Sequence, residues 1–191
     1  MKDRIIEEIL SSAKVKNLIT EDQNLVSQIE SCASNCIDSL RNGGKIIFCG
    51  NGGSFSDSQH LSAELTGRYM KDRDPLASIA LGTNTSSMSA IGNDYGYEFS
   101  FSRELEALGN KNDYLIAITT SGNSQNIIEV LKKAKSLDIK SVVLTGKDGG
   151  KVAHDAECII VPSESTARIQ ESHIMIGQII CGIIEDTMFP S

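Results

Sequence analysis

Apolar positions along the chain follow a helical spacing at first and a strand-like spacing after Gly44. Within residues 1–40, apolar residues recur every three to four positions and predict helices with one apolar stripe, formed by Leu25, Ile29, Cys32, Cys36 and Leu40. Further on, short runs rich in β-branched residues alternate with helical patterns. The runs predict strands near 45–49, 77–81, 114–119, 140–145 and 158–161. The other patterns predict helices near 54–70, 85–92, 97–108, 124–136 and 165–187.

Strands that alternate with helices predict a parallel sheet packed between two layers of helices. We therefore expect an α/β fold, a three-layer sandwich with a five-stranded parallel sheet. In the flavodoxin-like strand order 2-1-3-4-5, the first and third strands are neighbours at the switch point where such sheets bind ligands. The chain has 191 residues and neither linker nor repeat, so we expect one domain over 1–191, with an N-terminal helical segment 1–40 and an α/β core 41–191.

Loops rich in glycine and serine follow the first and third predicted strands. The first loop is Gly50-Asn51-Gly52-Gly53-Ser54, and the second is Thr119-Thr120-Ser121-Gly122-Asn123-Ser124. Glycines let successive backbone N–H groups point at one anion, and hydroxyl groups add donors without positive charge. Each loop precedes a predicted helix, whose first N–H groups are unpaired. Two such loops at matching positions predict a phosphorylated ligand held by neutral donors. The alternative is a pair of ordinary strand-to-helix turns.

The overall charge narrows the class of partner. A net charge of −7 at pH 7 argues against nucleic acid as the main partner, whereas a local nest of N–H groups still accommodates a small phosphorylated metabolite.

No apolar stretch approaches the ~20 residues of a membrane span, and the chain opens as an amphipathic helix rather than a signal peptide. Cys32 and Cys36 lie one helical turn apart and are expected to be buried thiols rather than metal ligands. These features indicate a cytoplasmic protein without a membrane partner.

His60 and Glu64 lie four positions apart in the predicted helix 54–70, which places them on one helical face. An imidazole nitrogen and a carboxylate oxygen form half of a typical zinc site. The alternative is a surface pair that stabilises the helix. Their position one or two turns beyond the first loop favours the metal site, because both side chains would line the crevice between the loops.

The last predicted helix carries two glutamines in a largely apolar sequence. Gln170 and Gln178 need hydrogen-bond partners if they are buried, and either the backbone or a ligand could supply them. His173 lies on the opposite flank from Gln178, and we expect a structural role for it rather than a catalytic one. Asn93-Asp94 form a turn that could reach the rim of the crevice.

Ordered motifs from about Gly43 to Glu185 resemble the phosphoheptose isomerase family, whose members contain a sugar-isomerase (SIS) domain and are also called sedoheptulose-7-phosphate isomerases. A run of this length and order is far more specific than one glycine-rich loop. The motifs are CGNGGS at 49–54, DSQHLSAELTGRY at 57–69, AIGNDYG at 90–96, FSRELEALG at 101–109, TTSGNS at 119–124, LTGKDGG at 144–150 and ARIQESHI at 167–174.

The resemblance implies a homotetramer with active sites between subunits, one Zn²⁺ in each site and a small-molecule sugar phosphate as substrate. It implies that Glu64 is the catalytic base. The implied zinc ligands are His60, Glu64, Gln170 and Gln178. The implied substrate contacts come from both loops, the turn and two metal ligands: Asn51, Gly52, Gly53, Ser54, Glu64, Asn93, Asp94, Thr119, Thr120, Ser121, Ser124 and Gln170.

One position departs from the family pattern. The family motif continues to a final histidine that serves as fourth zinc ligand and second acid/base group, and this chain has Gln178 there. Gln178 therefore occupies the second catalytic position. An amide oxygen binds a metal more weakly than imidazole and cannot carry a proton near neutral pH. Return of the proton by a water, a metal-bound hydroxyl or His173 is a hypothesis.

The resemblance predicts an enzyme, an aldose–ketose isomerase that converts D-sedoheptulose 7-phosphate into D-glycero-D-manno-heptose 7-phosphate for lipopolysaccharide or capsule. A rival class is the non-catalytic SIS protein of the DnaA initiator-associating type. It shares the fold, the missing final histidine and an ending similar to Thr187-Met188-Phe189-Pro190. Those proteins lack the counterpart of Glu64, so His60 together with Glu64 favours the enzyme. A third alternative is an isomerase or sensor for another sugar phosphate, because a fold does not fix the substrate.

Overall fold

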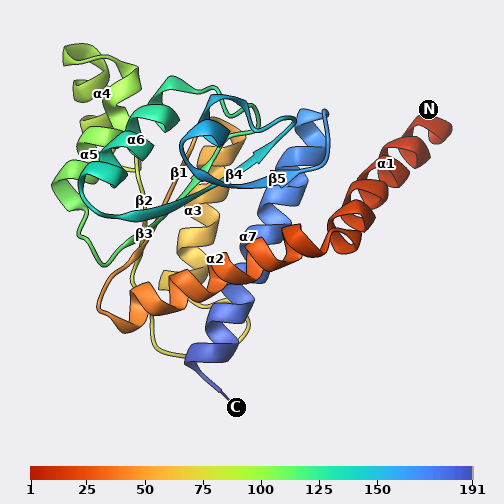
Figure 1. The fold of residues 1–191 in the computed structure, drawn as a ribbon, viewed down its shortest axis with the longest axis horizontal. Coiled ribbons are helices and arrows are strands. Elements are labelled where there is room, and N and C mark those ends of the chain that lie inside the picture. The colour runs from red at the N-terminus through yellow and green to blue at the C-terminus, as the bar shows by residue number, and fades with distance from the viewer. Residues whose placement is uncertain (191) are drawn as a thin grey trace.

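A five-stranded sheet forms the centre of the protein in the computed structural model, which describes residues 1–190 and leaves Ser191 of the predicted domain outside the described part. Every strand is parallel to its neighbours, in the order β2-β1-β3-β4-β5 (Figure 1). The predicted fold class and strand order are confirmed. The strands are β1 (Ile46–Gly50), β2 (Ser78–Ala80), β3 (Tyr114–Ile118), β4 (Lys140–Gly146) and β5 (Glu157–Val161).

The helices lie close to their predicted positions, with two differences. The helix predicted over 97–108 begins as a separate 3₁₀ turn, η1 (Tyr97–Phe99), and the turn between β4 and β5 contains a short 3₁₀ helix, η2 (Gly150–His154). Among the helices of residues 1–190, none has the length and apolar composition of a membrane span. The α-helices are α1 (Lys2–Glu21), α2 (Gln23–Arg41), α3 (Gly53–Thr66), α4 (Thr85–Asp94), α5 (Ser100–Leu108), α6 (Gln125–Ser136) and α7 (Thr166–Met188).

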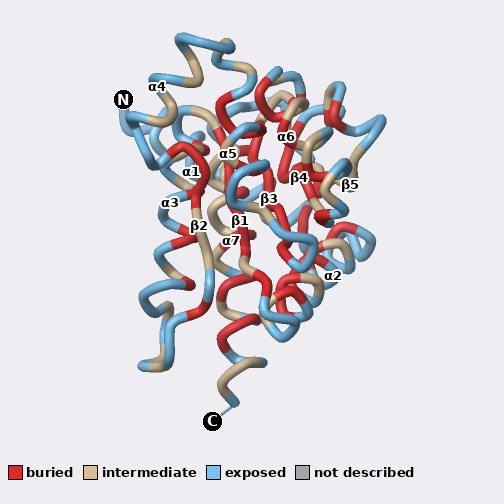
Figure 2. Tube along the Cα trace, turned by 90° about the vertical axis from the view of Figure 1, so that its left-hand side faces the viewer, coloured by how far each residue is buried: buried red, intermediate tan, exposed pale blue. Residues whose placement is uncertain are grey.

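Alternate residues of each strand point to opposite faces of the sheet, and this divides the core in two. In β3, Tyr114, Ile116 and Ile118 belong to the cluster with residues of α2, α3 and α7. Leu115 and Ala117 belong to the cluster with residues of α5 and α6 on the other face. Figure 2 shows β1 and β3 as buried segments in the centre. A parallel sheet covered on both faces by helices is the predicted three-layer sandwich.

The N-terminal segment consists of two helices rather than one continuous helical segment. Asp22 separates them, because its side chain accepts hydrogen bonds from the N–H groups of Asn24 and Leu25 at 3.0 and 3.1 Å and so caps the start of α2. The predicted apolar stripe lies on α2 and packs into the core. Cys32 and Cys36 within it are buried, as expected for thiols without a ligand role.

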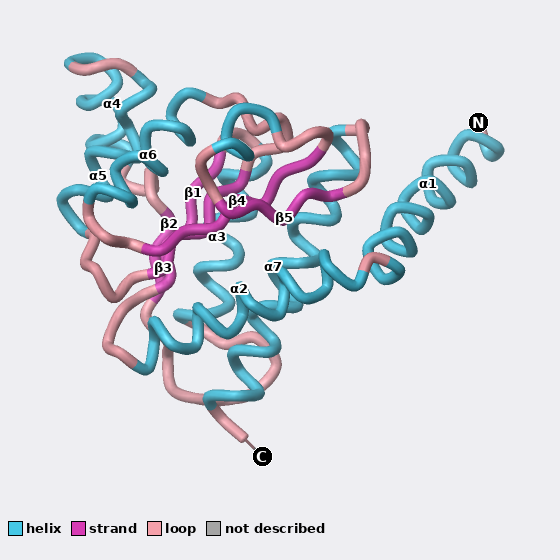
Figure 3. The backbone as a smooth tube through the Cα atoms, viewed as in Figure 1, coloured by secondary structure: helices cyan, strands magenta, loops and turns pink. Residues whose placement is uncertain are grey.

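Helix α1 projects from the body of the molecule (Figure 3). Its second half reaches the core, where Val15 and Ile19 are buried. Lys16 lies 3.3 Å from Glu171 of α7 and ties the two helices together. The first half leaves an apolar surface exposed, which we call the exposed α1 stripe: Ile5, Ile6, Ile9 and Leu10.

Candidate active site

The two predicted loops start side by side at the carboxyl edge of the sheet. Strands β1 and β3 pair directly, and their last residues, Gly50 and Ile118, are partners in the register. Gly52 in the first loop has φ 57° and Gly122 in the second has φ 64°, a left-handed conformation that favours glycine. A Cβ on Gly122 would also lie 1.8 Å from the carbonyl oxygen of Gly149. The topology and these glycines place the two loops side by side at the edge of the sheet that the strand order predicts.

Several backbone N–H groups in the two loops have no hydrogen-bond partner among the described residues. Within residues 1–190, the N–H groups of Gly52, Thr120, Ser121 and Gly122 donate to no backbone carbonyl. Helices α3 and α6 begin directly after the loops, and their N-termini add partial positive charge. Neutral N–H donors at two helix N-termini form a site suited to a phosphate group.

The predicted hydroxyl donors differ in how far a ligand can reach them. Ser54 and Thr119 are buried, whereas Thr120, Ser121 and Ser124 are half-buried. The Oγ1 atom of Thr119 lies 3.4 Å from the Oγ atom of Ser124, so these two hydroxyls converge within the second loop. The accessible hydroxyl donors therefore belong to the second loop.

Asn51 of the first loop is held by two residues that sequence analysis did not single out. Its amide exchanges two hydrogen bonds of 2.8 Å with the buried amide of Asn126 in α6. Its Oδ1 also accepts a hydrogen bond of 2.9 Å from the Tyr97 hydroxyl in η1. The sequence offered one indication that Asn126 belongs to the site: it is a polar residue in the first helical turn after the second loop. Nothing in the sequence indicated a role for Tyr97, because η1 lies far from both loops in sequence.

His60 and Glu64 face one another on α3, as the spacing predicts. The distance from Nε2 of His60 to Oε1 of Glu64 is 2.9 Å. The side chain of His60 is 50% exposed and that of Glu64 is 18% exposed. A ligand that approaches α3 can therefore reach both groups of this His60–Glu64 pair.

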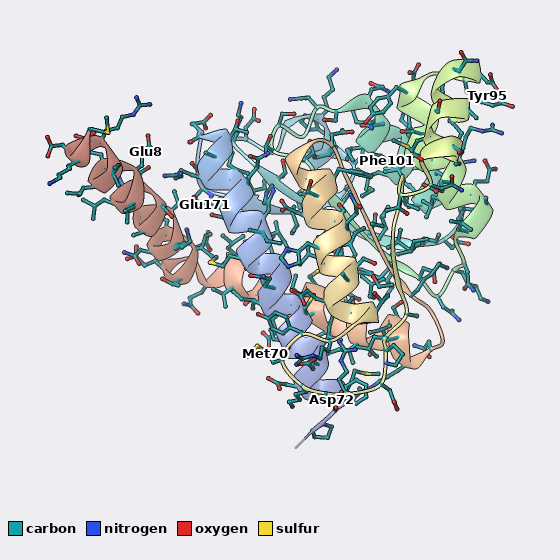
Figure 4. All side chains as sticks on the ribbon, turned by 180° about the vertical axis from the view of Figure 1, so that it is seen from behind. Glu8, Met70, Asp72, Tyr95, Phe101 and Glu171 are labelled. Atoms are coloured by element: carbon teal, nitrogen blue, oxygen red, sulfur yellow. The ribbon has the colours of Figure 1, made fainter. Side chains whose placement is uncertain are left out.

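Helix α7 packs along α3 and runs in the same direction (Figure 4). Gln170 lies at the start of α3, where its Nε2 is 3.1 Å from the position that a Cβ on Gly53 would take. Farther along, Gly177 packs on Leu61, since an added Cβ would lie 2.4 Å from a methyl group of that leucine. Gln178 is half-buried beside this contact and lies near the level of the His60–Glu64 pair.

The spacing along α7 separates the two glutamines. Gln170 and Gln178 are eight residues apart on one helix, roughly 12 Å along its axis. His60 is seven residues beyond Gly53, roughly 10 Å along α3. Along the helix axes, Gln178 therefore lies near the level of the His60–Glu64 pair, and Gln170 lies at the level of the first loop.

Asn93 and Asp94 form the last two residues of α4 rather than the predicted turn. Their side chains are exposed, and Nδ2 of Asn93 donates to Oδ1 of Asp94 at 2.8 Å. They line a hollow on the surface of α4. Tyr97, three residues on, connects this part of the chain to Asn51 in the first loop. A separate cavity of about 430 Å³ lies between α6 and η2 and includes none of the predicted site residues.

His173 has the structural role that sequence analysis favours. The ring is fully buried, and Nε2 donates to the backbone oxygen of Thr145 at 3.0 Å. Burial lowers the pKa of His173 to about 4, and this hydrogen bond opposes the effect only in part. The ring is neutral at pH 7 and closed to solvent. The hypothesis that His173 returns a proton to the substrate is therefore not supported.

The four predicted zinc ligands do not come together within one chain. No group of three or more His, Cys, Asp or Glu side chains in residues 1–190 is arranged to hold a metal ion. The His60–Glu64 pair supplies one nitrogen and one oxygen ligand of the kinds that zinc binds, and both are accessible. The other two predicted ligands are amides at different levels of α7.

Comparisons with known proteins extend over nearly the whole chain. A family model described as SIS domain matches residues 12–146. The phosphoheptose isomerase of Sulfurimonas denitrificans is 50% identical over 190 residues, which cover 99% of this chain and 97% of that protein. The phosphoheptose isomerase of Aneurinibacillus thermoaerophilus is also 50% identical over 190 residues, with 99% and 96% covered.

A solved structure shows the same fold. The phosphoheptose isomerase GmhA from Neisseria gonorrhoeae superposes with a TM-score of 0.90 at 41% identity, and the match covers 97% of this chain and 98% of that one. The matched length includes the loops, the His60–Glu64 pair and most of α7, which are the parts that carried the resemblance. The chain therefore belongs to the phosphoheptose isomerase family of SIS-domain proteins.

Proposed function

We propose that the protein interconverts D-sedoheptulose 7-phosphate and D-glycero-D-manno-heptose 7-phosphate, an aldose–ketose isomerisation. One observation carries the proposal: a phosphate cradle of neutral donors and an accessible His60–Glu64 pair occur together in a chain of this family. In this proposal the product supplies heptose for lipopolysaccharide or capsule. The free cysteines fit a reaction in the cytoplasm. Turnover of sedoheptulose 7-phosphate by the purified protein is the direct test.

The two loops are assigned to the phosphate end of the substrate. The free N–H groups of Gly52, Thr120, Ser121 and Gly122 supply donors for its oxygens. Binding energy gained at the phosphate holds the remote sugar carbons in place, which lowers the entropic cost of the reaction. Because the donors are neutral, the cradle binds the phosphate without placing a fixed cation beside it.

The reacting end requires a proton to move between two carbons. A base takes a proton from C1 of the ketose while the C2 carbonyl oxygen gains a proton, which gives the enediol. Return of the proton to C2, with loss of the hydroxyl proton from the oxygen on C1, then gives the aldose. The carboxylate of Glu64 fits the role of base, and His60 at 2.9 Å orients it. Gln178 cannot perform the second transfer, because an amide does not titrate near neutral pH. We therefore assign both transfers to Glu64.

A Zn²⁺ ion held by His60, Glu64 and the amide oxygens of Gln170 and Gln178 is part of the proposal. When bound, the ion would polarise the carbonyl of the substrate as charge develops on its oxygen. An amide oxygen is a weaker ligand than imidazole. Zinc affinity is therefore expected to be lower than in a variant with histidine in place of Gln178.

We further propose that each site is built from two copies of the chain in a homotetramer. Gln178 lies near the level of the His60–Glu64 pair, whereas Gln170 lies at the level of the first loop, roughly 12 Å away along α7. An ion at the His60–Glu64 pair would therefore receive its fourth ligand from Gln170 of the partner subunit. The same arrangement brings the phosphate cradle of one copy to the catalytic carboxylate of another.

Exposed apolar surface supports assembly with further copies. Ile9 and Leu10 of the exposed α1 stripe are each 62% exposed, and Ile179 on α7 is 44% exposed. Apolar patches on projecting helices are typical of protein–protein interfaces. A second copy would bury these side chains and cover the projecting half of α1.

Mixing two inactive variants tests whether sites are shared between copies. We expect Glu64→Gln and Gln170→Ala each to lack activity alone. In hybrids assembled from equal amounts of both, about one quarter of the shared sites would contain both native residues, so activity should return to about a quarter of wild type. The measurement is isomerase activity after co-expression with two different affinity tags and purification through both tags.

The control is a second pair of variants whose changed residues both lie on α3, so that one chain supplies both residues to a given site. Glu64→Gln mixed with His60→Ala leaves every site with one defect, so hybrids of this pair should stay inactive. An absence of recovery in the first pair, with hybrids present by mass, would contradict the shared site.

A further inference from the structure

Asn51 lies at the centre of a small hydrogen-bond network that joins three segments of the chain. We infer that Asn126 and Tyr97 are positioning residues, which hold the amide of Asn51 in the orientation that binds an oxygen of the phosphorylated substrate. The inference rests on the proposed function, because it gives these residues a part in the same site. Neither residue belongs to the loops that predicted the site.

The buried amide of Asn126 forms its side-chain hydrogen bonds with Asn51 alone among the described residues. Its side chain lies in the first turn of α6 and is 3% exposed. Both of its recorded hydrogen bonds go to Asn51, one in each direction, at 2.8 Å. A buried amide without such a partner is costly, so the pair restrains both side chains.

Within residues 1–190, these hydrogen bonds leave the Asn51 side chain with a single unpaired donor and no unpaired acceptor. Its Oδ1 accepts from Nδ2 of Asn126 and from the hydroxyl of Tyr97. Its Nδ2 donates one hydrogen to Oδ1 of Asn126. An amide nitrogen carries two hydrogens, so one N–H donor remains and the carbonyl oxygen is fully used. Asn51 therefore presents a donor, which suits an oxygen of the phosphate group.

The network also sets the relative position of the three segments that contain predicted substrate contacts. Asn51 lies in the first loop, and Asn126 follows the last residue of the second loop, Ser124, by two positions. Tyr97 follows Asp94 by three positions. Hydrogen bonds from Asn51 to both residues hold these segments together before a ligand arrives. Such preorganisation increases affinity because less ordering is needed on binding.

Steady-state kinetics of two variants test the inference. Tyr97→Phe removes one neutral hydrogen bond and is expected to raise KM for sedoheptulose 7-phosphate about fivefold. Asn126→Ala removes two bonds and should raise KM by about 10- to 30-fold. In both variants kcat should stay within about threefold of wild type, since the network contacts no reacting group. A fall in kcat with KM unchanged would overturn the positioning role.

Tyr95→Phe is the matched control. It removes a hydroxyl two residues from Tyr97, on a half-exposed ring that packs on the guanidinium of Arg103 at 3.7 Å. KM and kcat of this variant should match wild type within about twofold. Tyr97 is similarly half-exposed, so Tyr97→Phe is expected to fold even if Asn126→Ala does not.

Calorimetric titration with inorganic phosphate separates this inference from the proposed function. Weaker phosphate binding by Tyr97→Phe than by wild type and Tyr95→Phe would support the positioning role even in a protein without isomerase activity. Equal phosphate affinity in all three proteins would overturn it, whatever the turnover of the wild type. Absent turnover with this difference in affinity would count against the isomerase alone.

Discussion

Replacing Glu64 by glutamine is expected to lower kcat by about 10²- to 10⁴-fold, the usual contribution of a general base. The amide keeps the size of the side chain and cannot accept the proton from C1. His60 stays within reach of the new amide oxygen, so α3 should keep its structure. Steady-state kinetics measure the effect. Zinc content of the same samples distinguishes loss of the base from loss of a metal ligand.

Glu106→Gln provides the control for this change. Glu106 is a half-exposed carboxylate on α5 that pairs with Lys133 at 3.0 Å, away from both loops. Its replacement should leave kcat unchanged within about twofold. Turnover by Glu64→Gln within tenfold of wild type would remove Glu64 from the role of base.

Glu185→Gln is expected to destabilise the fold by about 3–5 kcal/mol, the usual cost of breaking a buried ion pair. Glu185 is buried in α7 and accepts N–H bonds from Tyr69, Met70 and Lys71 at 2.8 to 3.1 Å. The Nε of Arg73, whose side chain is 2% exposed, lies 3.1 Å from the same carboxylate. The amide would leave this guanidinium buried without its partner, and would turn an N–H₂ group toward backbone N–H groups. Urea unfolding at pH 7 measures the loss.

Asp186→Asn is the neighbouring control. Asp186 is 74% exposed and pairs with Lys71 at 2.8 Å, so its replacement should cost less than about 1 kcal/mol. Equal stabilities of the two variants would show that the buried carboxylate does not anchor the segment after α3.

The same carboxylate should make the protein sensitive to acid. Burial raises the pKa of Glu185, but the three N–H bonds and Arg73 lower it by more, so its pKa lies below the usual range. Its contribution is therefore complete above the unfolded pKa of about 4.3 and is lost as pH falls through the lower folded pKa. The stability difference between wild type and Glu185→Gln should shrink on acidification below about pH 4.

The sequence predicts those features that depend on residues close together in the chain. Strand runs that alternate with helices define a parallel sheet, and the order 2-1-3-4-5 places the two loops at one edge. The spacing of His60 and Glu64 fixes their shared face on α3, because four residues complete about one helical turn. Each of these inferences needs only neighbouring residues or a standard topology.

Other features depend on contacts between distant segments. Tyr97 reaches Asn51 across 46 residues, and no periodicity marks η1 as part of the site. The levels of Gln170 and Gln178 relative to His60 and Glu64 depend on how α7 aligns with α3, which the contacts at Gly53 and Leu61 show. Asp22 is a residue type that often caps a helix, but the helical pattern continues on both sides of it, so the sequence did not predict the break there.

The most direct measurement is an NMR assay of the purified protein with sedoheptulose 7-phosphate, run once with added Zn²⁺ and once with a chelator. We predict zinc-dependent appearance of D-glycero-D-manno-heptose 7-phosphate despite glutamine at position 178. Absence of turnover in both conditions, by a folded protein that still binds the sugar phosphate, would contradict it. Such a result would make the chain a binding protein with the fold of an isomerase.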